Sequence, residues 1–144
     1  MSSPTGKQAP RVCIGVIILN SRGELLLLRS HKFKNKWIVP GGGIEWGEQA
    51  EDTAKREALE ETGLRITDIT FLGAEECIFP AEFHKQQHFI FFDFYAKTFD
   101  TQVTLNDEAE EFRWIRPEKA STMDLNTSTR GFIKKYLAHT QKNQ

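Results

Sequence analysis

An unfavourable arrangement of charge on one predicted helix constrains this chain more than any other segment. Residues 49–62 are rich in Ala, Glu, Lys and Arg and contain neither Gly nor Pro, which predicts a helix with Gly63 as its C-terminal cap. Glu57, Glu60 and Glu61 are spaced i, i+3 and i+4, so a helix gathers them within an arc of about 100°. The predicted helix therefore presents three carboxylates on one face.

This clustering works against the stability of the helix. Like charges four residues apart repel by roughly a few tenths of a kcal/mol, and the C-terminal end of a helix favours cations over carboxylates. Three converging carboxylates instead provide the oxygen ligands that a hard divalent cation such as Mg²⁺ requires. The alternative is a solvated acidic face, which is what most runs of charge form, and the residues around the helix decide between the two.

Glycines and an arginine accompany this acidic face. Residues 41–43 are three consecutive glycines, which allow the backbone to approach a ligand closely. Arg56 precedes Glu57 and is suited to a bidentate pair with a carboxylate, for which Glu48 at the start of the helix is the expected partner.

The whole stretch matches a long and specific pattern. Residues 42–64 read GGIEWGEQAEDTAKREALEETGL and fit G-x5-E-x7-R-E-U-x-E-E-x-G-U, in which U is a bulky apolar residue, with Ala58 small for its U position. This pattern is the Nudix box, and the chain resembles a Nudix hydrolase in the box and in the order of the strands and helix around it.

The resemblance implies a pyrophosphohydrolase that depends on Mg²⁺, with Mn²⁺ as an alternative ion. Such an enzyme cleaves a phosphoanhydride bond in a nucleoside diphosphate linked to another moiety, for example in a nucleoside triphosphate. The metal ligands implied by the resemblance are Glu57, Glu60, Glu61 and the backbone carbonyl of Gly42. The Arg56–Glu48 pair then braces the loop and helix that carry these ligands.

The general base has several candidates, because family members take it from the box or from an acidic residue on a later loop. Residues 107–111 read DEAEE and precede a predicted strand. Inside this fold we expect Glu111 or Glu108, ahead of Glu110, to reach the metal site. An acid at position 75 or 76 is a further alternative, and a solvated acidic turn is the reading outside this fold.

Aromatic and histidine side chains near the box are candidates for contacts with the substrate, by stacking on a base or holding phosphate. The candidates are Trp46, His84, His88 and Phe33. Packing in the core or exposure in a solvated loop is the alternative for each of them.

Apolar runs define the expected fold. They predict strands at 12–19, 25–28, 37–39, 66–78, 88–97 and 112–115, and a second helix at 128–138. Together with the resemblance, this order implies an α+β fold, an α/β/α sandwich of the Nudix type with a mixed β-sheet flanked by helices. We expect a flexible N-terminal segment at residues 1–10 and a single domain at 11–140.

Composition excludes several classes of protein. The 19 Lys and Arg residues against 20 Asp and Glu give a net charge of −1, which excludes nucleic-acid binding by bulk positive charge. No apolar run reaches the ~20 residues of a membrane span, and residues 1–10 lack the apolar stretch of a secretory signal. With its two separate cysteines, the chain is expected to be cytoplasmic, with no membrane or nucleic-acid partner. Many relatives pair as dimers, so a homodimer stays open beside a monomer.

Three other functions stay open beside the leading one. Pro80 lies sixteen residues after Leu64, near the position of a proline in some ADP-ribose pyrophosphatases, so ADP-ribose or a nucleotide sugar is an alternative substrate. A nucleotide-sensing module without catalysis is an alternative of another class, disfavoured by the complete set of carboxylates. An RNA-decapping enzyme is disfavoured by the near-neutral charge.

Overall fold

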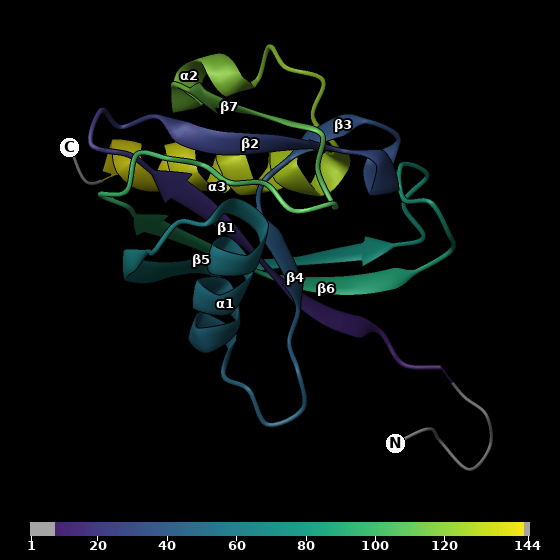
Figure 1. Cartoon of the computed structure of the whole chain (residues 1–144). Helices are drawn as coiled ribbons and strands as arrows, with labels where there is room; N and C mark the ends of the chain where they lie inside the picture. Colours follow the sequence, from purple (N-terminus) through teal and green to yellow (C-terminus); the bar gives the residue numbers. More distant parts are fainter. Residues whose placement is uncertain (1–7, 143–144) are drawn as a thin grey trace.

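The computed structural model describes residues 8–142, so positions 1–7 of the expected N-terminal segment lie outside the described residues (Figure 1). The strands are β1 (Arg11–Leu19), β2 (Leu25–Ser30), β3 (Lys36–Ile38), β4 (Gly41–Gly43), β5 (Thr67–Ile78), β6 (His88–Lys97) and β7 (Glu111–Ile115). The helices are the 3₁₀ turn η1 (His31–Phe33), α1 (Ala50–Thr62), α2 (Pro117–Ala120) and α3 (Thr127–Lys142).

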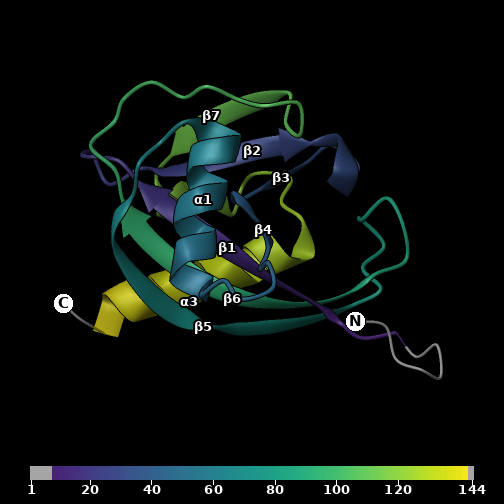
Figure 2. The same cartoon turned by 60° about the horizontal axis from the view of Figure 1, so that its bottom comes forward.

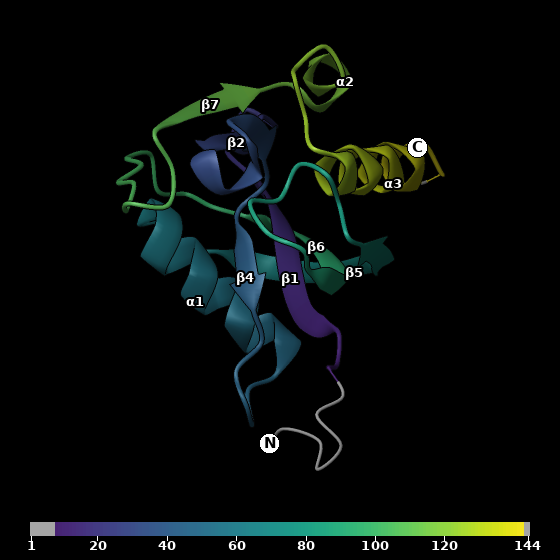
Figure 3. The same cartoon turned by 90° about the vertical axis from the view of Figure 1, so that its right-hand side faces the viewer.

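The strands form one mixed sheet in the order β3-β2-β1-β6-β5, with β4 also paired to β1 and β7 to β2. The β1–β6 pair is parallel, and the other pairs are antiparallel. Helix α1 lies across one face of the sheet and α3 lies on the other, as Figures 2 and 3 show from two directions. The expected α+β sandwich is therefore confirmed.

Strand β1 is buried on both faces because each face packs against a helix layer. On one face Ile14 and Val16 belong to the same core cluster as Ala54 of α1. On the other face Ile17 clusters with Phe132 of α3. This arrangement explains why residues 12–19 are apolar at every position and not at alternate ones.

Two short elements differ from the expectation. Residues 41–43, which follow the strand expected at 37–39, form β4 against β1, and residues 117–120 form α2. A Cβ on Gly41 would lie 2.1 Å from the Ile14 carbonyl oxygen, so this pairing requires glycine. Elements of three or four residues are too short to show hydrophobic periodicity, which is why the sequence pattern does not reveal them.

A buried carboxylate lies on the α3 side of the sheet. Asp93 interrupts the apolar strand β6 and is completely buried. The Lys135 ammonium of α3 donates to Asp93 Oδ2 over 3.1 Å and also pairs with Glu75 at 3.3 Å. Burial raises the pKa of Asp93 to about 7, against the opposing effect of Lys135.

No helix within residues 8–142 is long and apolar enough to cross a lipid bilayer.

Candidate active site

Helix α1 turns two of the predicted metal ligands toward the sheet. Ala54 and Ala58 are fully buried, and they bring the helix close to the strands beneath it. Glu57 and Glu61 lie beside these alanines and are only 8% and 6% exposed. The helix ends at Gly63, whose φ of 72° is left-handed and whose N–H donates to the Leu59 carbonyl, as its cap position predicts.

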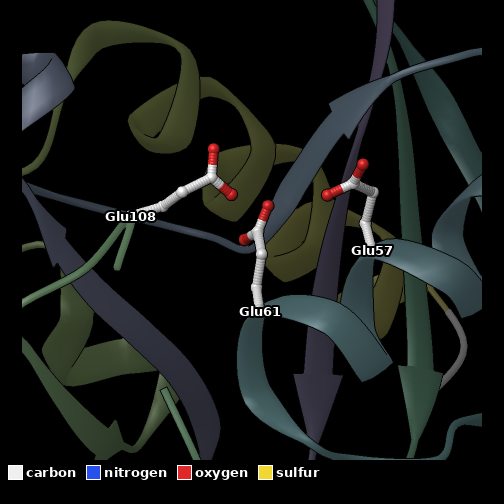
Figure 4. Close-up of side chains that lie close together, drawn as sticks. All are labelled: Glu57, Glu61 and Glu108. Atoms are coloured by element: carbon white, nitrogen blue, oxygen red, sulfur yellow. The ribbon is translucent and has the colours of Figure 1, made fainter. Parts of the chain in front are cut away.

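Three carboxylates meet at this point of the structure. Glu57, Glu61 and Glu108 each contribute one oxygen, and these oxygens all lie within 4.8 Å of one another. Figure 4 shows Glu61 between the other two, with Glu108 reaching in from the loop before β7. An anionic donor set made only of oxygen fits a hard cation such as Mg²⁺ or Mn²⁺. We call these three residues the carboxylate cluster.

The cluster is electrostatically unfavourable without a cation. Burial raises the pKa of Glu61 well above its usual range, and the neighbouring Glu57 and Glu108 carboxylates raise it further. Burial also raises the pKa of Glu57. Like charges held this close disfavour the ionised state, and a bound divalent cation would reverse that preference.

Arg56 braces one side of the cluster. Its guanidinium donates twice to Glu48, from Nε over 2.8 Å and from Nη2 over 3.0 Å, which is the expected bidentate pair. It also donates to Glu57 Oε1 over 2.8 Å and to the Gly43 carbonyl over 3.1 Å. The contact with Arg56, supported by Thr53, lowers the pKa of Glu48 to about 2. Arg56 therefore ties α1 to β4 and to the loop between them.

Two other predicted acids lie outside the carboxylate cluster. The Glu60 side chain is 54% exposed and accepts a hydrogen bond of 3.3 Å from Arg56. Glu111 lies on β7 and pairs with Arg29 at 2.8 Å. Of the acids expected on the later loop, Glu108 is the one that the structure brings to the cluster. The roles of all the predicted metal ligands and general-base candidates stay predictions.

A pocket with a cavity volume of about 130 Å³ opens next to the cluster, and both Glu61 and Glu108 line it. Five aromatic rings line it, four of them in the series Phe33, Phe83, Phe89 and Phe91, with Phe132 as the fifth. Successive rings in this series lie 4.9, 4.9 and 5.1 Å apart between centroids. A ligand can stack a flat aromatic group in such a pocket while its other end lies beside the carboxylate cluster.

The predicted substrate contacts divide into two groups. Phe33 lines the pocket, and its contact with a substrate stays a prediction. Trp46 is fully exposed in the loop before α1, and the residues that line the pocket include neither His84 nor His88. The His84 ring instead packs against the ring of its neighbour Phe83, with centroids 4.4 Å apart. Contacts of these three residues with a substrate stay predictions.

Phe89 and Phe91 line the pocket although neither was predicted to contact a substrate. The signal was present, because alternate residues of a strand point to opposite faces. In the strand at 88–97, Phe89 and Phe91 share one face, whereas Phe92 and Phe94 belong to the face covered by α1.

Gly42 on β4 sets the space available to Glu57. A Cβ at this position would lie 2.5 Å from Oε1 of Glu57 and 2.7 Å from Oε2. We expect Gly42→Ala to displace this carboxylate and to lower hydrolytic activity by roughly 10- to 100-fold, because small misplacements of catalytic groups are costly. Because a flexible side chain can move aside, the melting temperature should change little.

Steady-state kinetics and thermal unfolding check this prediction, with Gly43→Ala as the matched control. A Cβ on Gly43 meets the Arg11 guanidinium at 2.9 Å and not the cluster. Equal activity losses in the two variants would contradict a specific role for the space beside Glu57.

Comparisons with known proteins agree with this geometry. The model of the NUDIX domain family matches residues 9–136. A nucleoside triphosphatase, NudI of Escherichia fergusonii, is 33% identical over 104 residues, which cover 68% of this chain and 74% of NudI. A MutT NUDIX hydrolase from Burkholderia pseudomallei superposes with a TM-score of 0.74 at 25% identity, over 89% of this chain and 98% of its own.

A further solved structure resembles the fold at lower identity. The NUDIX domain of NrtR from Shewanella oneidensis, solved in complex with ADP ribose, superposes with a TM-score of 0.79 at 17% identity. The match covers 96% of this chain and 93% of that domain.

Proposed function

The chain belongs to the Nudix hydrolase family, enzymes that hydrolyse acid anhydride bonds, and from this premise we propose that it is a divalent-cation-dependent nucleoside triphosphate pyrophosphohydrolase. The observation that carries the proposal is the carboxylate cluster of Glu57, Glu61 and Glu108 at the edge of an aromatic pocket. The carboxylate cluster can hold a cation and the aromatic pocket can hold a base. One nucleotide can therefore place its phosphates at the cation and its base in the pocket.

The chemical problem is the attack of water on a phosphate chain that already carries several negative charges. Positioning and charge neutralisation supply most of the catalysis in such reactions. When bound, Mg²⁺ or Mn²⁺ supplies positive charge to the phosphate oxygens and lowers the pKa of a coordinated water. Glu57, Glu61 and Glu108 would hold the ion, and Arg56 with Glu48 keeps α1 and the preceding loop in place around it.

Glu60 and the Gly42 carbonyl remain ligands in this proposal because both positions adjoin Glu57. The same Arg56 nitrogen, Nη1, donates to both Glu57 and Glu60. A Cβ on Gly42 would lie 2.5 Å from Oε1 of Glu57, so the backbone at Gly42 adjoins this carboxylate. For the general base we propose Glu108, through the carboxylate oxygen that is not offered to the ion, with Glu111 as the alternative if the loop before β7 shifts when substrate binds.

The triphosphate is proposed as substrate because the NudI relatives are named nucleoside triphosphatases. ADP-ribose is the second candidate, supported by the position of Pro80 and by the ADP ribose bound to the similarly folded NrtR domain. We further propose a single domain over residues 11–140 that acts on free nucleotides in the cytoplasm, as a monomer or a homodimer.

A substrate panel tests this proposal. Nucleoside triphosphates, nucleoside diphosphates, ADP-ribose and nucleotide sugars are each incubated with Mg²⁺, with Mn²⁺ and with EDTA. We expect pyrophosphate release from triphosphates with either ion and none with EDTA. Faster cleavage of ADP-ribose would favour the second candidate. Binding without turnover across the whole panel would indicate a nucleotide-sensing module.

A further inference from the structure

We propose that Lys32 is a movable counter-ion of the active site. It neutralises Glu108 while the carboxylate cluster holds no cation, and it binds the phosphate groups of the substrate once a cation is held. This inference rests on the proposed function, and it assigns to η1 a role that the Nudix box does not contain.

The ion pair between Lys32 and Glu108 is the starting observation. The Lys32 ammonium contacts Oε1 of Glu108, the same residue that supplies one carboxylate of the cluster. The two side chains are 40% and 39% exposed. A pair this exposed contributes about 0–1 kcal/mol, so a stronger partner for either charge can separate it.

The backbone of Glu108 is held without the lysine side chain. Its carbonyl accepts a hydrogen bond of 3.1 Å from the Ser30 hydroxyl, and its N–H donates to Asn106 Oδ1 over 3.0 Å. Two residues on, the Glu110 N–H donates to the Arg29 carbonyl over 3.0 Å. The loop before β7 is therefore fixed to the end of β2 by its backbone. Loss of the lysine charge should leave the backbone of Glu108 in place, so that its side chain still reaches the cluster.

The backbone of Lys32 is fixed as well, so the movement is confined to its side chain. The Lys32 N–H donates to the Ser30 hydroxyl over 3.2 Å, and its carbonyl accepts from the His84 N–H over 2.9 Å. A flexible four-carbon stem then allows the ammonium to swing between Glu108 and the interior of the pocket that Lys32 lines.

Charge balance gives the direction of this movement. A divalent cation held by the carboxylate cluster would repel an ammonium that contacts Glu108. The phosphate groups that enter with the substrate offer the displaced ammonium a new partner. Arg56 cannot take this part, because Glu48 and Glu57 already hold its guanidinium. Among residues 8–142, Lys32 and Arg56 form the ion pairs with the cluster, and Lys32 is the one of the two that has the freedom to move.

Lys32→Met tests the proposal with opposite changes in two measurements. Removal of a competing charge should tighten Mn²⁺ binding to the free protein by about 3- to 5-fold, measured by electron paramagnetic resonance of free Mn²⁺. Loss of the phosphate contact should raise KM for a nucleoside triphosphate by about tenfold, with a smaller change in kcat. The matched control is Lys34→Met, which removes the same charge from an exposed residue two positions along the chain.

Each outcome decides the question. Weaker Mn²⁺ binding in Lys32→Met would show that the lysine only positions Glu108, and unchanged Mn²⁺ affinity and KM would show an ordinary surface pair. Either result overturns this inference and leaves the proposed function standing. If the unmodified protein binds no Mn²⁺, both proposals fail together. Lys32→Arg keeps the charge and should restore KM to within about threefold.

Discussion

Glu61→Gln is expected to lower the rate of nucleotide hydrolysis by about 10²- to 10³-fold, while the free energy of unfolding without metal stays the same or rises. Activity falls because a neutral amide is a poor ligand for a hard cation. Stability holds because Glu61 is buried beside Glu57 and Glu108, where its negative charge is unfavourable. The amide oxygen can still accept the hydrogen bond of 3.3 Å from the Gly41 N–H.

Two measurements check this expectation together. Steady-state kinetics with Mg²⁺ gives the loss of activity, and thermal unfolding with EDTA or with Mg²⁺ gives the stabilisation by the ion, which should shrink in the variant. Glu51→Gln, an exposed position on the same helix, removes the same charge and should leave both quantities nearly unchanged. A variant that unfolds in EDTA would instead identify Glu61 as a structural residue.

The Nudix box predicts the local part of this site well, because a helix fixes the spacing of its own side chains. The spacing of Glu57, Glu60 and Glu61 places all three on one arc, and the alanines beside them predict the side that meets the sheet. The spacing does not reveal which of the three side chains the sheet buries. In the structure Glu60 falls on the exposed side and Glu61 on the buried side.

The part of the site that lies beyond the box depends on tertiary structure. Glu108 reaches the cluster because β7 pairs with β2 and because Ser30 binds the loop that precedes β7. Neither contact follows from the residues at 107–111, which favour Glu108 and Glu111 equally. The pairing of Glu111 with Arg29 separates the two acids. Register across the sheet, and not the sequence of the loop, determines which acid faces the cluster.

Asp93→Asn is expected to stabilise the protein increasingly as the pH rises from about 4 to 7. The folded state holds the pKa of Asp93 near 7, above the ordinary value of 3.8, because burial outweighs the hydrogen bond from Lys135. Between these two values the folded chain binds a proton that the unfolded chain has released. The contribution of Asp93 to the free energy of unfolding is therefore fully present below pH 3.8 and is lost as the pH rises through 7. The total loss is at most roughly 4 kcal/mol.

Asparagine removes this titration and keeps the shape of the side chain, so the difference in unfolding free energy between variant and parent isolates the contribution of Asp93. Urea denaturation at several pH values measures that difference, which should grow from pH 5 to pH 8. Asp124→Asn removes an acid that pairs with Lys36 on the surface, and its difference should stay flat. If the parent instead becomes more stable than the variant as the pH rises, the ion pairs of Lys135 with Asp93 and Glu75 outweigh burial. In that case Asp93 would be ionised in the folded protein at neutral pH.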